Sequence, residues 1–244
     1  KRQVLYAPDA SSSVRVINTT TNTVTATIAV GSTPRSAVVS PDGTKVYVTN
    51  YSSNTVSVIN TATNTVTATI TGFSQPNRAV MSLDGSKLYV ANFGGSSVAV
   101  VNTSTNTITS TIALGAAPWS IVMNSTGTRL YTGNVYANSV SVINASTNTF
   151  VTNITVGSAP HEVTVSAAGD RVFAANYSSN SVSVINTTTN TISTTIAGIS
   201  NPMALATSID DSTLYVGQYQ STSVRLVDLS NYCLLYTSPS PRDV

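Results

Sequence analysis

The sequence predicts an all-β protein assembled from one repeated four-stranded unit, and three observations lead to this prediction. First, the 244 residues are crowded with threonine, serine, asparagine and β-branched apolar residues, which suit strands and turns better than helices. Second, landmark residues return at one fixed spacing along nearly the whole chain. Third, each repeat carries four short apolar segments bounded by turn residues. Although only 8% of the residues are charged, 41% are hydrophobic, which argues against intrinsic disorder.

The repeat has a period of 42 residues, and three independent series of landmarks share it. The first series comprises Asn18, Asn60, Asn102, Asn144 and Asn186, with Asp228 in the sixth copy. The second comprises Tyr47, Tyr89, Tyr131, Phe173 and Tyr215. The third comprises Pro34, Pro76, Pro118, Pro160 and Pro202. Because all three keep the same period without an insertion, composition alone does not explain them.

The four segments of the second repeat cover residues 35–40, 45–50, 55–60 and 65–71. The first two are joined by Ser-Pro-Asp-Gly at residues 40–43, where proline presets φ and glycine allows a positive φ. Four strands joined by short turns form an antiparallel meander, and no segment resembles a crossover helix. Four strands at a period of roughly 40–45 residues are the signature of a β-propeller blade.

The chain is out of phase with its blades, which bears on ring closure. It opens at Val4-Leu5-Tyr6, which aligns with a second strand, and the repeat pattern ends after Asp228. We therefore expect four complete and two partial blades within residues 1–231, arranged as an open arc or incomplete ring and truncated at both ends; a strained six-bladed closure is the alternative. Residues 232–244 share nothing with the repeat and resemble translated adapter sequence, so we set them aside as an artefact. Alternatively, Leu234-Leu235-Tyr236 pairs as a fourth strand.

Several motifs resemble the YVTN β-propeller repeat family. Residues 47–50 read Tyr-Val-Thr-Asn, the tetrapeptide that names the family, and residues 88–92 read Leu-Tyr-Val-Ala-Asn. The Ser-Pro-Asp-Gly turn and the ending Val-Ser-Val-Ile-Asn-Thr-x-Thr-Asn-Thr are also similar to its consensus. The resemblance covers about residues 3–231. It implies a propeller, often seven-bladed, of secreted or surface-layer-type proteins that act as binding or scaffold modules, and hence an extracellular or cell-surface location, with the periplasm as the alternative.

Charge and apolar runs exclude two classes of partner. The net charge is +2 and the basic residues are scattered, so no stripe is suited to nucleic acid. No apolar run approaches the ~18–20 residues of a membrane span. Cys233 is the single cysteine, so no intrachain disulfide forms. We predict no cofactor, and we expect a protein or carbohydrate partner at the cell surface.

The predicted binding surface lies at one mouth of the central channel, where propellers commonly hold ligands. The position after each periodic proline varies most in an otherwise monotonous repeat, and the position after it also varies. Two tyrosines lie on the loops between second and third strands. The candidate residues are Arg35, Asn77, Arg78, Trp119, His161, Glu162, Met203, Tyr51 and Tyr177. The alternative is that these are tolerant loop positions and that the tyrosines seal gaps between blades.

Two functions follow from this surface. The first is a non-enzymatic binding or scaffold propeller at the cell surface. The second is a metal-assisted hydrolase or lyase, because lactonases and streptogramin lyases share the propeller architecture at fold level. His161 and Glu162 are the only histidine and the only glutamate. Adjacent strand residues point to opposite faces and a catalytic zinc site needs three protein ligands, so we predict neither catalytic nor metal-binding residues.

Overall fold

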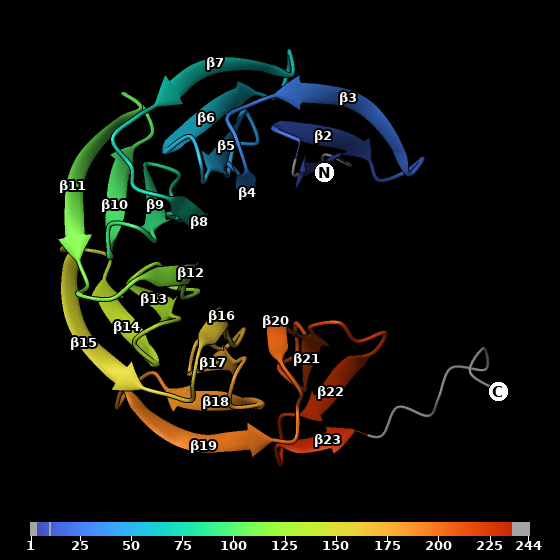
Figure 1. Cartoon of the computed structure of the whole chain (residues 1–244), viewed down its shortest axis with the longest axis vertical. Coiled ribbons are helices and arrows are strands. Elements are labelled where there is room, and N and C mark those ends of the chain that lie inside the picture. Colours follow the sequence, from blue (N-terminus) through green and yellow to red (C-terminus); the bar gives the residue numbers. More distant parts are fainter. Residues whose placement is uncertain (1–3, 10, 236–244) are drawn as a thin grey trace.

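The computed structural model describes residues 4–9 and 11–235, which form 23 strands in six antiparallel sheets (Figure 1). The first sheet contains β1 (Val4–Asp9), β2 (Ser13–Asn18) and β3 (Thr23–Ala29). The second contains β4 (Pro34–Val39), β5 (Lys45–Asn50), β6 (Thr55–Asn60) and β7 (Thr65–Ile70). The third contains β8 (Pro76–Met81), β9 (Lys87–Asn92), β10 (Ser97–Asn102) and β11 (Thr107–Ala113).

The remaining three sheets repeat the same order from the inner to the outer strand. The fourth contains β12 (Pro118–Met123), β13 (Arg129–Asn134), β14 (Ser139–Asn144) and β15 (Thr149–Thr155). The fifth contains β16 (Pro160–Val165), β17 (Arg171–Asn176), β18 (Ser181–Asn186) and β19 (Thr191–Ala197). The sixth contains β20 (Pro202–Thr207), β21 (Thr213–Gln218), β22 (Val224–Asp228) and β23 (Cys233–Leu235).

The predicted blade architecture is confirmed, with one difference in the sixth sheet. There β23 pairs with β22 through Cys233, Leu234 and Leu235, although these residues lie in the segment we had set aside. Five sheets therefore have four strands and one has three, instead of four complete blades and two partial ones. The apolar residues of this segment supply a strand without belonging to the repeat. Residues 236–244, including Tyr236 of the expected strand, lie outside the described residues.

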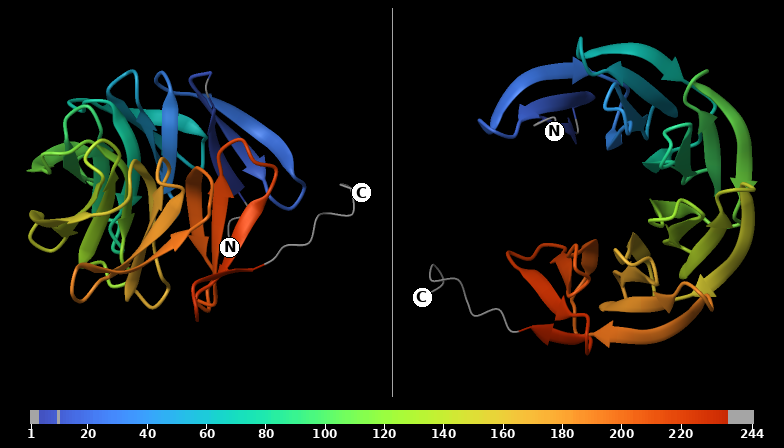
Figure 2. Two further views of the ribbon diagram at one scale, coloured as in Figure 1. Left: turned by 60° about the horizontal axis from the view of Figure 1, so that its bottom comes forward. Right: turned by 180° about the vertical axis from the view of Figure 1, so that it is seen from behind.

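The six sheets form an open arc, as the sequence predicts, and the strained six-bladed ring is wrong. Figure 1 shows the first strands β4, β8, β12, β16 and β20 lining the inside of the arc, with the long fourth strands outside. A gap separates the first sheet from the sixth, and the right view in Figure 2 shows the same opening from behind.

Apolar side chains packed between consecutive sheets form the core. In each of the four inner sheets one face contacts the preceding sheet and the other contacts the following one. Tyr47, Val56 and Val58 of the second sheet, for example, pack against Leu88 and Val90 of the third. Because every inner sheet is covered on both sides, its central strands are buried on both faces, as residues 56–59 of β6 show.

Each end of the arc leaves uncovered a position that is buried in the other sheets. We call Tyr47, Tyr89, Tyr131, Phe173 and Tyr215 the tyrosine column. Its first four members are at most 1% exposed, whereas Tyr215 in the sixth sheet is 41% exposed. At the other end Leu5 is 53% exposed, although Val46, which occupies the same place in the register of the second sheet, is fully buried. Each end therefore presents a sheet face that its neighbours bury.

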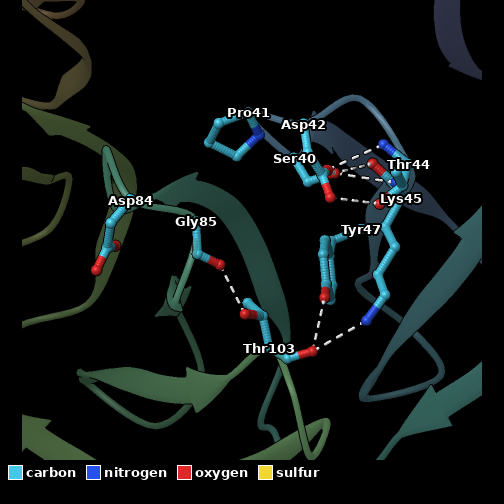
Figure 3. A pocket seen from close by; sticks show the side chains of 9 residues that line it. All are labelled: Ser40, Pro41, Asp42, Thr44, Lys45, Tyr47, Asp84, Gly85 and Thr103. Carbon is cyan, nitrogen blue, oxygen red and sulfur yellow. Dashed lines mark hydrogen bonds between the residues drawn. The ribbon is translucent and has the colours of Figure 1, made fainter.

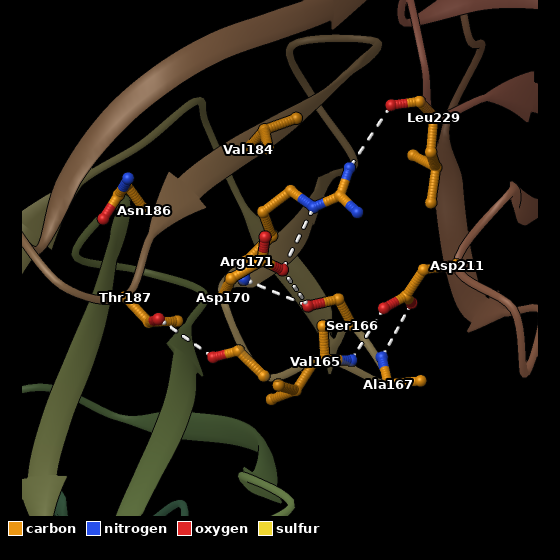
Figure 4. A network of polar contacts seen from close by, with 12 residues as sticks. Val165, Ser166, Ala167, Asp170, Arg171, Val184, Asn186, Thr187, Asp211 and Leu229 are labelled. Atoms are coloured by element: carbon orange, nitrogen blue, oxygen red, sulfur yellow. Dashed lines mark hydrogen bonds and ion pairs between the residues drawn. The ribbon is translucent and has the colours of Figure 1, made fainter.

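Polar contacts join consecutive sheets at the rim that carries the first-to-second and third-to-fourth strand turns. Figure 4 shows the junction of the fifth and sixth sheets, where the Asp211 carboxylate accepts hydrogen bonds from the backbone N–H groups of Ala167 and Ala168, each at 2.7 Å. The Arg171 guanidinium donates to the Leu229 carbonyl at 3.3 Å and pairs with Asp170. We call this end of the blades the turn rim and the opposite end the mouth rim.

Candidate functional site

The mouth rim carries the loops that enter each first strand and the loops between second and third strands. Backbone hydrogen bonds join the two loop types: the Tyr51 N–H, for example, donates to the Thr33 carbonyl at 3.0 Å. Close packing supports this end: a Cβ on Gly31 would lie 2.8 Å from the Cβ of buried Asn50. Asn50 in turn donates to Ser57 at 2.9 Å, which holds the second-to-third strand loop at its base.

A β-bulge follows the periodic proline in every complete blade. The strand register shifts between Pro34 and Ser36 in the second sheet, and the equivalent shift recurs in the four later sheets. A bulge leaves one residue without a partner in the ladder and re-aims its side chain. The bulged residues include the candidates Arg35, Asn77, Arg78, Trp119, His161 and Met203. The sequence variation at these positions therefore coincides with a local release from the ladder.

The bulged residues and the loop aromatics form a continuous row of rings along the mouth rim. Tyr51 lies 6.1 Å from Phe93, Phe93 lies 5.4 Å from Trp119, and Trp119 lies 5.2 Å from His161, all as ring-centroid distances. The row continues from His161 to Tyr177 at 5.1 Å and from Tyr177 to Tyr219 at 5.9 Å. We call these six residues the aromatic row. All five contacts between these rings are tilted or edge-to-face, which is a favourable arrangement for ring quadrupoles.

Sequence reasoning missed two members of the row. Phe93 and Tyr219 occupy the position of Tyr51 and Tyr177 in the third and sixth repeats, so the 42-residue spacing alone could have located them. Tyr136, which lies 5.7 Å from Phe93 and is largely exposed, follows that column by one residue in the fourth repeat. Met203 occupies the bulge of β20 and has no ring, so the row reaches the sixth sheet through Tyr219.

Arg35 lies against the start of the aromatic row. Its guanidinium carbon is 5.1 Å from the centre of the Tyr51 ring and 5.9 Å from that of Trp119. Both distances fall within the range of a cation–π contact. Arg35 is exposed, so it presents a positive charge beside partly buried aromatic rings.

A second cationic contact crosses from one blade to the next but one. The Arg78 guanidinium of β8 lies 3.6 Å from the Glu162 carboxylate of β16, although β12 lies between these strands. Burial raises the pKa of Glu162, while the charge of Arg78 acts in the opposite direction. Buried Asn77 acts differently from its exposed neighbour Arg78, because its amide donates to the Trp119 carbonyl at 2.6 Å and so joins β8 to β12.

His161 has a different set of neighbours from adjacent Glu162. Its ring lies between those of Trp119 and Tyr177, and its buried Nδ1 has no hydrogen-bond partner among the described residues. Burial lowers the pKa of His161, so the imidazole is neutral at pH 7. His161 therefore contributes a ring to the row, whereas Glu162 contributes a charge to the contact with Arg78. Within the described residues, no group of three or more His, Cys, Asp or Glu side chains is arranged to hold a metal ion.

A separate pocket lies at the turn rim between the second and third sheets (Figure 3). The Lys45 ammonium and the Tyr47 hydroxyl both donate to the Thr103 carbonyl there, at 3.1 and 3.3 Å. Asp42 in the lining accepts bonds from Ser40 and Thr44 of its own turn. These polar groups already hold the two blades together, so the pocket is part of the blade junction.

Comparison with known proteins identifies relatives of the fold. Residues 15–151, more than half of the chain, match the family model described as lactonase, 7-bladed beta-propeller. No match to a curated protein was found. Hydrazine synthase from Kuenenia stuttgartiensis is similar over 93% of this chain and 74% of that one, with 23% identity and a TM-score of 0.84. A functionally unknown protein from Desulfotomaculum acetoxidans DSM 771 is similar over 96% and 78%, with 18% identity and a TM-score of 0.82.

These two structures share the fold with this chain, and at such identities the likeness concerns the fold alone. The described strands and loops also include no helix with the length and hydropathy of a membrane span. The mouth rim thus combines rings, two guanidinium groups and one carboxylate on a propeller scaffold.

Proposed function

This chain belongs to the lactonase family of seven-bladed β-propellers, and from that premise we propose that it is a non-enzymatic carbohydrate-binding propeller of the cell surface. The observation that carries the proposal is the aromatic row at the mouth rim. A row of six rings that is half-buried along most of its length offers apolar contact area to a flat ligand at low cost in side-chain entropy.

The polar groups beside the row suit a sugar. Arg35 and Arg78 offer fork-shaped donors, and the Glu162 carboxylate offers acceptors. Sugar rings combine apolar faces with hydroxyl groups at their edges, so a surface of rings flanked by donors and acceptors matches both. The scaffold supports this role because the bulges release Arg35 and Arg78 from the strand ladder, while Glu162 stays paired with Ala175 in β17.

The test uses the fact that Trp119 is the only tryptophan and lies within the row. The protein is titrated with chitotetraose, cellotetraose, maltotetraose and xylotetraose while tryptophan emission is recorded. We expect saturable change with at least one oligosaccharide, weakened at least tenfold in Tyr51→Ala and Arg35→Ala. Phe150→Ala, an exposed aromatic of outer strand β15, is the matched control and keeps wild-type affinity. Failure of all four sugars to bind at millimolar concentration overturns the carbohydrate assignment.

The family match favours a second candidate, the hydrolysis of a lactone. Arg78 and Glu162 supply a cation for the developing oxyanion and a carboxylate whose pKa burial raises, which is the direction required of a general base. Water attack would open the ester and release a proton as the product acid ionises. Proton release from glucono-δ-lactone, measured above the uncatalysed rate, tests this candidate. Activity lost in Glu162→Gln and retained in Phe150→Ala supports it, and rates equal to the uncatalysed reaction exclude it for this substrate.

A further inference from the structure

The two guanidinium groups beside the aromatic row differ in what they contact. The guanidinium carbon of Arg35 lies 5.1 Å from the Tyr51 ring centre and 5.9 Å from the Trp119 ring centre. The guanidinium of Arg78 lies 3.6 Å from the Glu162 carboxylate. Within residues 4–9 and 11–235, no ion pair includes Arg35. The described part of this surface therefore pairs one of its two cations with a carboxylate of the protein and leaves the other without one.

The backbone and the rings together determine where Arg35 lies. The register of β4 shifts between Pro34 and Ser36, so Arg35 has no partner in the strand ladder. Its side chain is exposed, whereas the Tyr51 and Trp119 side chains are half-buried. Contact with two rings restricts the position of the guanidinium, and its exposure leaves N–H donors accessible to a ligand.

A carboxylate is the ligand group that matches these donors. The planar guanidinium presents its N–H groups as a fork that can bind both oxygens of one carboxylate. A sugar ring stacked on Trp119 that carries a carboxylate of its own would place that group beside Arg35. On the other side of Trp119 lies the His161 ring, and Glu162 follows His161 in β16. The negative charge of Glu162 disfavours a second carboxylate there, so the charged end of such a ligand would point towards Arg35.

We propose that the mouth rim recognises an acidic oligosaccharide, and that Arg35 determines this specificity by binding the carboxylate of a uronic acid whose ring stacks on Trp119. The proposal rests on the carbohydrate-binding function proposed above and adds the charge of the ligand to it. Neutral sugars meet the same rings and the same N–H donors without a charge-assisted pair of hydrogen bonds, and therefore bind more weakly.

The test compares tetragalacturonate with its tetramethyl ester, which keeps the sugar chain and removes the negative charges. The whole chain is titrated with each compound while the emission of Trp119 is recorded, and isothermal titration calorimetry provides a readout that does not depend on this residue. We expect the acid to bind at least tenfold more tightly than the ester. A tetraglutamate peptide, which carries carboxylates on a chain without sugar rings, should bind at least tenfold more weakly than tetragalacturonate.

Two chain variants separate Arg35 from a general effect of positive charge. In Arg35→Gln the preference for the acid over the ester should fall below threefold, while circular dichroism stays unchanged because this side chain is exposed and outside the ladder. Arg129→Gln removes the same charge at the start of β13 on the turn rim and is the matched control. It should keep the wild-type preference.

The outcomes distinguish this inference from the function on which it rests. Equal affinity for the acid and the ester, or binding of neutral tetrasaccharides alone, overturns the acidic specificity and leaves a carbohydrate-binding surface. A preference for the acid that persists in Arg35→Gln overturns the role of Arg35. Binding of tetraglutamate as tight as that of tetragalacturonate overturns the assignment to a sugar. If neither the acid, the ester nor any neutral tetrasaccharide binds at millimolar concentration, both proposals fail.

Discussion

Truncation of two tyrosines in the same column should have clearly different costs, because only one of them is covered by a following sheet. Tyr89 is 1% exposed between the third and fourth sheets, and its hydroxyl donates to the Ala145 carbonyl at 3.0 Å. Tyr215 occupies the same position in the sixth sheet and is 41% exposed. The comparison of Tyr89→Ala with Tyr215→Ala therefore isolates the contribution of one blade-to-blade interface.

The magnitudes follow from burial. A fully buried tyrosine removes about 150–200 Å² from water, worth about 4–5 kcal/mol at ~25 cal/mol per Å². Tyr215 keeps roughly three-fifths of that burial, so its truncation should cost about 2.5–3 kcal/mol on the same scale. The buried hydrogen bond of Tyr89 adds about 1 kcal/mol. The free energy of unfolding should thus fall by about 2–3 kcal/mol more in Tyr89→Ala than in Tyr215→Ala.

The assay is urea unfolding of both variants and the wild type, followed by far-UV circular dichroism because that signal reports on all six sheets. Tyr89→Phe serves as the intermediate variant, since it removes the hydroxyl and keeps the ring. We expect it to lose only the hydrogen-bond contribution. Equal destabilisation by the two alanine substitutions would refute the reasoning, because it would mean that the face of the sixth sheet that carries Tyr215 is covered in solution.

Three further predictions concern packing, a blade junction and pH. Gly31→Ala should destabilise the protein by about 1–3 kcal/mol because its Cβ would clash with Asn50, whereas Gly95→Ala, whose nearest neighbour is 3.3 Å away, should cost less in the same urea assay. Asp211→Asn keeps a residue that tolerates the φ of 55° but has one acceptor oxygen for two N–H groups, so thermal unfolding should show a loss of about 0.5–1.5 kcal/mol. Burial raises the pKa of the three buried tyrosines of the column from 10.0, so their contribution is complete below pH 10 and is lost as pH rises through their folded-state pKa. The melting temperature should fall above pH 10, and a flat profile up to pH 12 would contradict this.

The blade architecture could be read from the sequence because the determinants of a blade are local. Apolar segments, Ser-Pro-Asp-Gly turns and Asn-rich turns recur without insertion, so each copy specifies the same four strands. The open arc was also predictable, since β1 aligns with a second strand. β23 matches the alternative interpretation of the end segment, because Leu234 and Leu235 pair with β22. General strand preference favours this strand, whereas the repeat itself gives no sign of it.

The mouth rim was predictable only in part. The variable column located Arg35, Trp119 and His161, which the structure joins through ring contacts, but their release from the ladder by bulges depends on backbone register. The approach of Arg78 to Glu162 depends on the curvature of the arc, because the two residues lie in the third and fifth sheets, with the fourth sheet between them. Sequence spacing within one repeat carries no information on that curvature.

The gap between the first and sixth sheets leaves the described residues as a linear array in which no sheet is held by ring closure. Each inner sheet is stabilised by two neighbours and each terminal sheet by one, so the energetics resemble those of a one-dimensional repeat protein. Local opening should then begin at β1–β3 and at β20–β23 and proceed inward, sheet by sheet. The fourth sheet, which carries Trp119, lies among the best-protected parts of the chain, so amide exchange should slow progressively from both ends towards the middle of the arc.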